Sequence, residues 1–178
     1  MNNKIVKLAV ILFAVSAIVA LCLGLVNGIT ADRIAALAKE KLDTAMKEVL
    51  PASEYTEVTY TGSDVQVDSV YQAGDAGWVV QCTVSGSQGS ITMLTGINAD
   101  GTVSGISVLD HGETPGLGAV AAATSDKGVQ WRAQFEGVAS AAVTKDGGQI
   151  EAISGATITS RAICAGVTAA QNAVKSVG

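Results

Sequence analysis

The chain has 178 residues with 48% hydrophobic side chains, which predicts one modest domain plus one further element and excludes a multidomain enzyme. Charged residues make up only 15%, below the roughly 25% of soluble domains, so part of the apolar excess is expected in lipid. The net charge of −5 without a basic cluster beyond the N-terminal lysines excludes a nucleic-acid footprint. Three separated cysteines and a single histidine argue against a metal centre built from this chain alone, so redox chemistry would need an organic cofactor.

A segment without charges covers residues 8–26, and its nineteen residues match the length that a helix needs to cross about 30 Å of hydrocarbon. Lys4 and Lys7 precede it and a nearly neutral flank follows. The positive-inside bias therefore predicts a cytoplasmic N-terminus and an exported remainder. A cleaved signal peptide is the alternative, but its apolar region is typically about 7–15 residues long. A lipid anchor on Cys22 is disfavoured because Leu21, a large residue, precedes it.

A second helix is expected between the membrane segment and the domain. The pair Asn27-Gly28 interrupts the apolar run, Thr30 can cap a helix over 31–50, and Pro51 ends it. One apolar stripe recurs along this helix at Ile34, Ala38, Leu42, Ala45 and Val49. The stripe predicts that the helix packs on the domain.

The apolar period then changes to two, which indicates antiparallel strands. These strands are expected at Val65–Val67, Trp78–Val84, Ile91–Ile97 and Val103–Leu109. The short link 98–101 contains a glycine and suits a tight hairpin connection. A loop with three glycines and one proline follows at 111–118, where these residues fix a particular backbone path. The single histidine, His111, is expected to make a hydrogen bond in this loop.

Helices return in the last third of the chain. A helix is expected at 128–135, with Trp131 and Phe135 in the core, followed by a short strand at 150–153. The final helix is expected from Thr159, with apolar positions at Ile163, Val167, Ala170 and Val174. These elements predict an α+β fold, with an antiparallel sheet flanked by helices. Cys82 and Cys164 are expected as buried thiols, and a disulfide between them stays open.

The sequence SGATITS at 154–160 lies immediately before that final helix. A helix N-terminus offers free N–H groups and partial positive charge to a phosphate, and Gly155 and Ala156 allow close backbone approach. Serine and threonine are also the ordinary helix caps. The turn alone therefore leaves two interpretations open, a phosphate site and a structural cap.

A second motif supports the phosphate interpretation. HGETPGLG at 111–118, Trp131, Gln134-Phe135 and SGATITS at 154–160 together resemble the membrane-anchored FMN-binding subunits of the Rnf and Nqr respiratory complexes. The resemblance extends from the N-terminal apolar segment to the last helix and so covers nearly the whole chain. It implies a cytoplasmic tail and membrane helix at 1–28, a connecting amphipathic helix at 29–51 and an extracytoplasmic FMN-binding domain at 52–178.

The resemblance also implies how the cofactor is held. A separate flavin transferase esterifies the FMN phosphate to the threonine that ends an S/T-G-A-T motif, here Thr157, while Thr159 is the rival acceptor and is expected to bond the phosphate. The acidic position at Asp146-Gly147 resembles the one that such transferases recognise. The remaining cofactor-binding residues are expected at the turn and in the loop: Ser154, Gly155, Ala156, Ser160, Glu113, Thr114, Gly116 and Leu117. No catalytic or metal-binding residue is expected.

The function implied by the resemblance is electron relay in an Rnf-type complex, which moves electrons between ferredoxin and NAD while translocating sodium ions or protons. Expected partners are the other membrane subunits, including an iron–sulfur-bearing pair and a second flavin subunit. The alternatives are a protein like the C subunit of the sodium-translocating NADH:quinone oxidoreductase, whose members are usually longer, and a flavin-free, membrane-tethered assembly protein.

Overall fold

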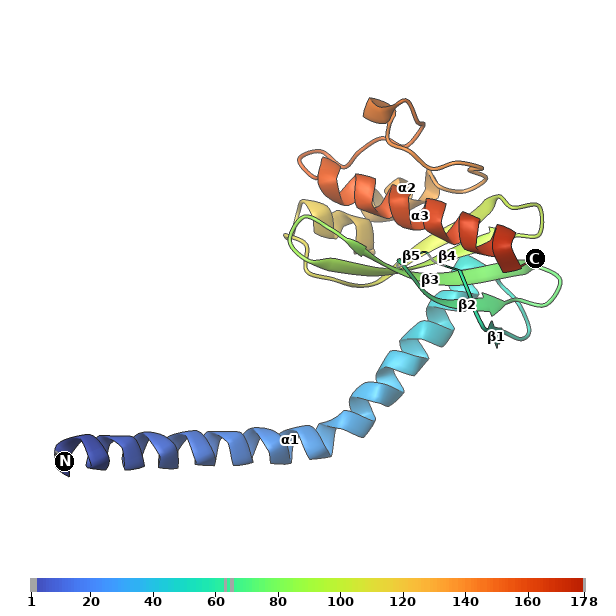
Figure 1. Ribbon diagram of the computed structural model, residues 1–178. Helices are drawn as coiled ribbons and strands as arrows, with labels where there is room; N and C mark the ends of the chain where they lie inside the picture. The colour runs from blue at the N-terminus through green and yellow to red at the C-terminus, as the bar shows by residue number, and fades with distance from the viewer. Residues whose placement is uncertain (1–2, 63, 65, 178) are drawn as a thin grey trace. The chain divides into compact units, whose positions relative to one another are not determined.

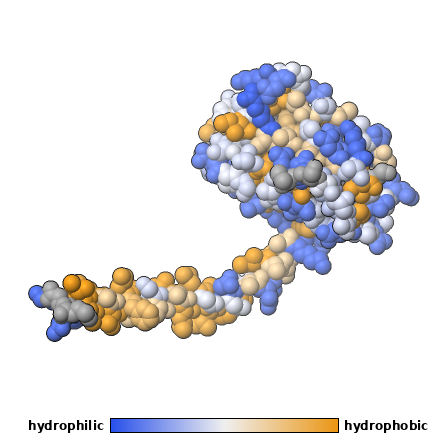
Figure 2. All heavy atoms as spheres, viewed as in Figure 1, coloured by the Kyte–Doolittle hydropathy of each residue, from blue (hydrophilic) through white to orange (hydrophobic). Residues whose placement is uncertain are grey.

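The computed structural model describes residues 3–62, 64 and 66–177. The chain divides into two compact units, Met1–Lys41 and Leu42–Gly178. Helix α1 (Asn3–Val49) forms the described part of the first unit and ends in the second. It is long and apolar enough to cross a membrane. Its large apolar side chains are exposed, and Figure 2 shows them along the face of this segment in view.

Helix α1 is continuous, so the expected break at Asn27-Gly28 is wrong. One glycine costs a helix only about 1 kcal/mol, which the long flanking helical segments absorb. Thr30 lies inside the helix, and its hydroxyl donates to the Val26 carbonyl at 2.9 Å rather than capping a new helix. The helix does end just before Pro51, as predicted.

The apolar stripe on α1 is covered only at its C-terminal end. Ala45, Met46 and Val49 are buried, whereas Ile34 remains 60% exposed. The packing expected for the whole stripe is therefore confined to the last turns, which belong to the second unit.

The second unit is built on a five-stranded antiparallel sheet in which every strand pairs with its neighbours in the chain (Figure 1). The strands are β1 (Thr56–Val58), β2 (Val67–Gln72), β3 (Gly77–Ser85), β4 (Ser90–Asn98) and β5 (Val103–His111). The strands expected at 78–84, 91–97 and 103–109 are confirmed, each slightly longer than predicted. Strand β1 is not among the predicted strands, and Val65, where another strand was expected to begin, lies outside the described residues.

The expected hairpin between β4 and β5 is confirmed. Gly101 has φ +85°, a conformation that L side chains rarely adopt. The Asp100 carboxylate accepts hydrogen bonds from both the N–H and the hydroxyl of Thr102, at 2.9 and 2.6 Å.

Both faces of the sheet are covered. One face carries the larger core, in which side chains such as Val80, Cys82 and Met93 pack with helix α3 (Thr157–Val177). Figure 1 shows α3 lying along this face. The other face presents Val79 and Leu94 to the last turns of α1. Strands β3 and β4 therefore carry buried apolar residues on both faces, because each contributes to two cores.

The segment between β5 and α3 contains helix α2 (Asp126–Ala133) and two short 3₁₀ turns, η1 (Gly118–Ala122) and η2 (Thr144–Asp146). The helix expected at 128–135 is confirmed. Trp131 and Phe135 lie in the core, where their rings pack edge-on with 5.3 Å between the ring centroids. The strand expected at 150–153 is wrong, because among the described residues this stretch makes one isolated bridge, between Val143 and Ile150.

The apolar pattern of that stretch has a different origin. Ile150 and Ile153 are buried in the core without belonging to a strand. Cys82 and Cys164 are also buried, and both are free thiols.

Candidate functional site

The turn before α3 fixes the place where the last helix begins. Gly155 has φ +76°, and the Ala156 N–H donates to the Ile153 carbonyl at 2.9 Å. The buried Ser160 hydroxyl accepts from the Ile153 N–H and donates to the Ala156 carbonyl, both at 3.0 Å. Helix α3 therefore starts at Thr157, two residues earlier than predicted.

The loop after β5 forms the second part of the site. The Thr114 carbonyl accepts the N–H groups of Leu117 and Ala119, at 3.1 and 3.3 Å, and Gly116 has φ +78°. This tight turn leaves Thr114 and Leu117 exposed while Glu113 is buried.

The turn between β3 and β4 forms the third part. The Gly86 N–H donates to the Gly89 carbonyl at 2.7 Å, which closes the turn. The backbone N–H groups of Ser87 and Gln88 both donate to Oε1 of Glu113, at 2.7 and 3.0 Å.

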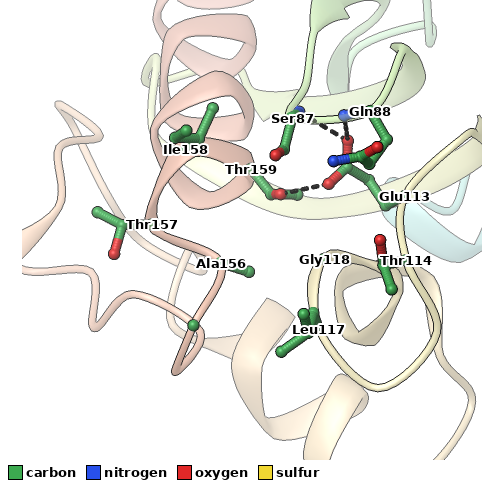
Figure 3. A pocket seen from close by; sticks show the side chains of 11 residues that line it. Ser87, Gln88, Glu113, Thr114, Leu117, Gly118, Ala156, Thr157, Ile158 and Thr159 are labelled. Atoms are coloured by element: carbon green, nitrogen blue, oxygen red, sulfur yellow. Dashed lines mark hydrogen bonds between the residues drawn. The ribbon is translucent and has the colours of Figure 1, made fainter.

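Glu113 joins all three parts. Its Oε2 accepts a hydrogen bond from the Thr159 hydroxyl at 2.5 Å, across 46 positions in sequence (Figure 3). Its own N–H donates to Nδ1 of His111 at 3.2 Å, which confirms a hydrogen bond at that histidine. Glycines make room for the carboxylate, since a Cβ at Gly86 or Gly118 would collide with one of its oxygens.

Glu113 is only 6% exposed, yet its carboxylate stays ionised. Burial by itself raises the pKa of Glu113, but hydrogen bonds from Thr159, Gln88 and Ser87 outweigh burial and lower it. The site therefore contains a fixed negative charge at neutral pH.

A pocket of about 290 Å³ opens where these three parts meet. Its lining comprises Ser87, Gln88, Glu113, Thr114, Leu117, Gly118, Gly155, Ala156, Thr157, Ile158 and Thr159 (Figure 3). Pockets for small ligands usually measure about 300–1,000 Å³, so this one can enclose part of a nucleotide-sized molecule and leaves the rest outside. The first three N–H groups of α3, from Thr157 to Thr159, have no acceptor within the helix. They make this end of the pocket suitable for an anion.

The structure brings together most of the residues that the sequence predicts for the site. Glu113, Thr114, Leu117, Gly155, Ala156, Thr157 and Thr159 all line the pocket. Gly116, Ser154 and Ser160 are not part of its described lining.

The hydroxyls of the turn have different surroundings. Thr157 is half-buried, and Figure 3 shows its hydroxyl pointing away from Glu113. The resemblance implies a bond from Thr159 to the phosphate, whereas in the structure the fully buried Thr159 directs its proton to Glu113. Ser160 is likewise fully buried and bonded to backbone.

Ser87 and Gln88 are site residues that the sequence does not predict. They contribute backbone N–H groups to Glu113, and a backbone contribution is independent of side-chain identity. The available signal is the glycine- and serine-rich stretch at 85–90, which indicates only a turn.

A charged pair lies beyond the first turn of α3. Asp146 binds the Arg161 guanidinium with both carboxylate oxygens, at 2.6 and 2.7 Å. The hydrogen bond from Arg161 lowers the pKa of Asp146. Arg161 follows Thr157 by four positions, so the two residues share one face of the helix.

Comparison with known proteins identifies the family. Residues 86–172 match the FMN-binding domain, and residues 1–49 match the RnfG N-terminal region. The first match contains all three parts of the pocket. The G subunit of an ion-translocating oxidoreductase complex from Methanosarcina acetivorans is 38% identical, over 91% of this chain and 90% of its own length. The chain belongs to the family of G subunits of ion-translocating oxidoreductase complexes.

Other members of the family are similar to the chain over most of its length. The G subunit of the Na⁺-translocating ferredoxin:NAD⁺ oxidoreductase complex from Acetobacterium woodii is 37% identical, over 90% of this chain and 87% of its own length. The G subunit of an ion-translocating oxidoreductase complex from Cereibacter sphaeroides is 36% identical, over 83% of this chain and 74% of its own length. The fold expected from the resemblance, an apolar N-terminal helix followed by an FMN-binding α+β domain, is confirmed.

Proposed function

We propose that this chain is the electron-relay subunit of an Rnf-type ferredoxin:NAD⁺ oxidoreductase and carries FMN on a phosphoester bond to Thr157. The observation that carries the proposal is the pocket at the N-terminus of α3, which lies within the stretch matching the FMN-binding domain. Bound there, FMN would supply electron transfer in single or paired steps.

The residues of the pocket fit such a group. The N–H groups of residues 157–159 and the helix dipole favour a phosphate. Gly155 suits this turn because a side chain there would be strained at φ +76° and its Cβ would lie only 3.0 Å from the Leu117 side chain. Leu117 and Ile158, which are 44% and 60% exposed, offer apolar surface at the pocket rim to a flavin ring.

The surroundings of the two candidate threonines favour Thr157 as the attachment residue. Thr159 is fully buried and its proton is engaged by Glu113, so a transferase cannot reach its oxygen without opening the site. Thr157 is half-buried and lines the pocket. A threonine hydroxyl is a weak nucleophile unaided, so a separate flavin transferase must supply the base. In that step the threonine oxygen bonds to the flavin-side phosphorus of a flavin dinucleotide donor, the phosphoanhydride bond breaks, a nucleoside monophosphate leaves, and the hydroxyl proton passes to the transferase.

The N-terminal helix supports a place in the membrane. Lys4 and Lys7 precede the apolar segment, which by the positive-inside bias puts the N-terminus in the cytoplasm and the FMN domain outside. Electrons would then reach the domain from an iron–sulfur-bearing pair of membrane subunits and leave to a second flavin subunit. The match of residues 1–49 to the RnfG N-terminal region supports an Rnf-type complex over the Nqr-type alternative.

The proposal is tested on the full-length chain produced together with a flavin transferase. Intact mass should show one FMN adduct, and the denatured protein should fluoresce on a gel under ultraviolet light. Thr157→Ala should abolish both signals while Thr159→Ala retains an adduct. Loss of the adduct in Thr159→Ala but not in Thr157→Ala would identify Thr159 as the attachment residue instead. A wild-type chain without an adduct would leave the flavin-free assembly protein as the remaining interpretation.

A further inference from the structure

Glu113 lines the pocket, and each residue that donates a hydrogen bond to its carboxylate also lines the pocket. Ser87 and Gln88 hold Oε1, and Thr159 holds Oε2. The three residues come from two elements that are far apart in sequence, the β3–β4 turn and helix α3. One carboxylate thus connects the three segments that form the pocket: the β3–β4 turn, the loop after β5 and the start of α3.

The close packing around this carboxylate leaves it little freedom. A Cβ at Gly118 would collide with both Glu113 Oε2 and Thr159 Oγ1, and one at Gly86 would collide with Oε1. The residue itself is 6% exposed, so water screens its charge weakly. A group bound in the pocket therefore experiences a nearby negative charge in a fixed place.

We infer that Glu113 is a positioning residue that shapes the flavin pocket before the cofactor arrives, and that its charge makes the bound flavin harder to reduce. The inference rests on the proposed function. Its physical basis is that electron uptake adds negative charge to the pocket, and a fixed anion opposes such a change in a poorly screened site.

The two halves of the inference can be separated by choice of variant. In Glu113→Gln the amide oxygen can still accept from Ser87 and Gln88, and the amide nitrogen can donate to the Thr159 hydroxyl, which has lone pairs free to accept. This variant keeps the three contacts, with the direction of the hydrogen bond to Thr159 reversed, and removes the charge. Glu113→Ala removes both.

A matched control for the charge is Asp110→Asn. Asp110 lies near Glu113 in the chain, on β5, and is exposed, so the variant removes the same charge from a solvated position. Water and salt screen that position, and its effect on the pocket is expected to be small.

The experiment measures FMN adduct by intact mass and the midpoint potential of the attached flavin by spectroscopic titration, on full-length chains produced with the transferase. Glu113→Gln should still carry the adduct and show a midpoint raised by an amount equivalent to about a tenfold change in the redox equilibrium, or about 59 mV for a one-electron step. Asp110→Asn should shift it much less. Glu113→Ala should lower the fraction of chains that carry the adduct at least about threefold, as expected for a destabilised site.

The outcomes separate the two proposals. Equal midpoints in wild type, Glu113→Gln and Asp110→Asn would overturn the role of the charge. Full loading of Glu113→Ala would overturn the positioning role. A thermal midpoint of Glu113→Gln no more than about 4 °C below that of wild type, the shift expected for a loss on the order of 1 kcal/mol, shows that a potential shift does not come from a loosened fold. An adduct missing from the wild type rejects the proposed function and the inference together, whereas an adduct present with unchanged potentials rejects only the inference.

Discussion

The backbone carbonyl of Val49, at the end of α1, lies directly against the α-carbon of Gly96 in the middle of β4. A Cβ at Gly96 would collide with this carbonyl oxygen, while one at Gly105, the register partner on β5, would lie 3.4 Å from it. The Ser104 hydroxyl also donates to the Val49 carbonyl. The last turn of α1 is thus docked on the sheet through a helix-end carbonyl, one of the groups that a helix leaves without an internal partner.

Gly96→Ala is therefore expected to lower the free energy of unfolding by about 1–3 kcal/mol, because backbone must move to admit the methyl group. Gly105→Ala is the matched control, and its cost should stay within about 0.5 kcal/mol. Urea unfolding of the full chain in detergent, followed by circular dichroism, measures both. Equal losses in the two variants would contradict the close approach at Gly96.

The ring of Phe135 is the largest fully buried side chain of the second unit. Phe135→Ala is expected to cost about 3–5 kcal/mol, since it leaves a cavity and removes the edge-on contact with Trp131. Val129→Ala, on the helix that also carries Trp131, is the control, because Val129 is 50% exposed and its loss should change stability by no more than about 0.5 kcal/mol. The same urea unfolding experiment ranks them, and a Phe135→Ala variant as stable as the control would place the ring outside the core.

Stability should depend on pH through Glu113. Its pKa is lower in the folded chain than its ordinary value of 4.5, so the unfolded chain takes up the proton more readily. The stabilisation by the ionised carboxylate is therefore complete above the ordinary value and is lost as the pH falls through the folded one. At neutral pH, Glu113→Gln should be less stable than wild type by on the order of 1 kcal/mol, since hydrogen bonds to a charged acceptor are the stronger ones.

The difference in the free energy of unfolding between wild type and Glu113→Gln should shrink in acid. Unfolding of both chains at about pH 7 and at about pH 3 measures the change. Asp110→Asn provides the control for the loss of a solvated charge. A difference that grows towards low pH would mean that the Glu113 carboxylate is already protonated in the native protein.

Much of the fold could be predicted because local pattern and tertiary position agree. Strands β3, β4 and β5 combine apolar runs with flanking turn residues, and the hairpin glycine Gly101 takes the positive φ that its position suggests. Strand β1 is three residues long and largely exposed, so it carries no apolar pattern to detect. At 150–153 the apolar residues are buried by the core without a strand partner, a distinction that periodicity cannot make.

The segments that line the pocket could be predicted from the sequence, but the hydrogen bonds between them could not. The loop at 111–118 and the turn at 154–160 carry recognisable residue patterns, and both line the pocket. The bond between Glu113 and Thr159 spans 46 positions, and no local preference encodes it. Thr159 could be identified as a polar residue near the helix start, but the acceptor of its hydroxyl hydrogen bond is evident only from the folded chain.

The two thiols of the second unit should be unreactive in the folded protein. Burial raises the pKa of Cys82 to about 12 and that of Cys164 to about 11, with Asp68 and Asp146 respectively adding to the effect. Because the thiolate is the reactive form, a maleimide or iodoacetamide should not label either residue in native protein near neutral pH. Unfolding without a reductant should expose both free thiols. In a Cys22→Ser chain, which removes the third cysteine, intact mass should show no added label before unfolding and labels on both thiols afterwards. Label on the native protein would contradict their burial, and no label after unfolding would indicate that the two cysteines are joined.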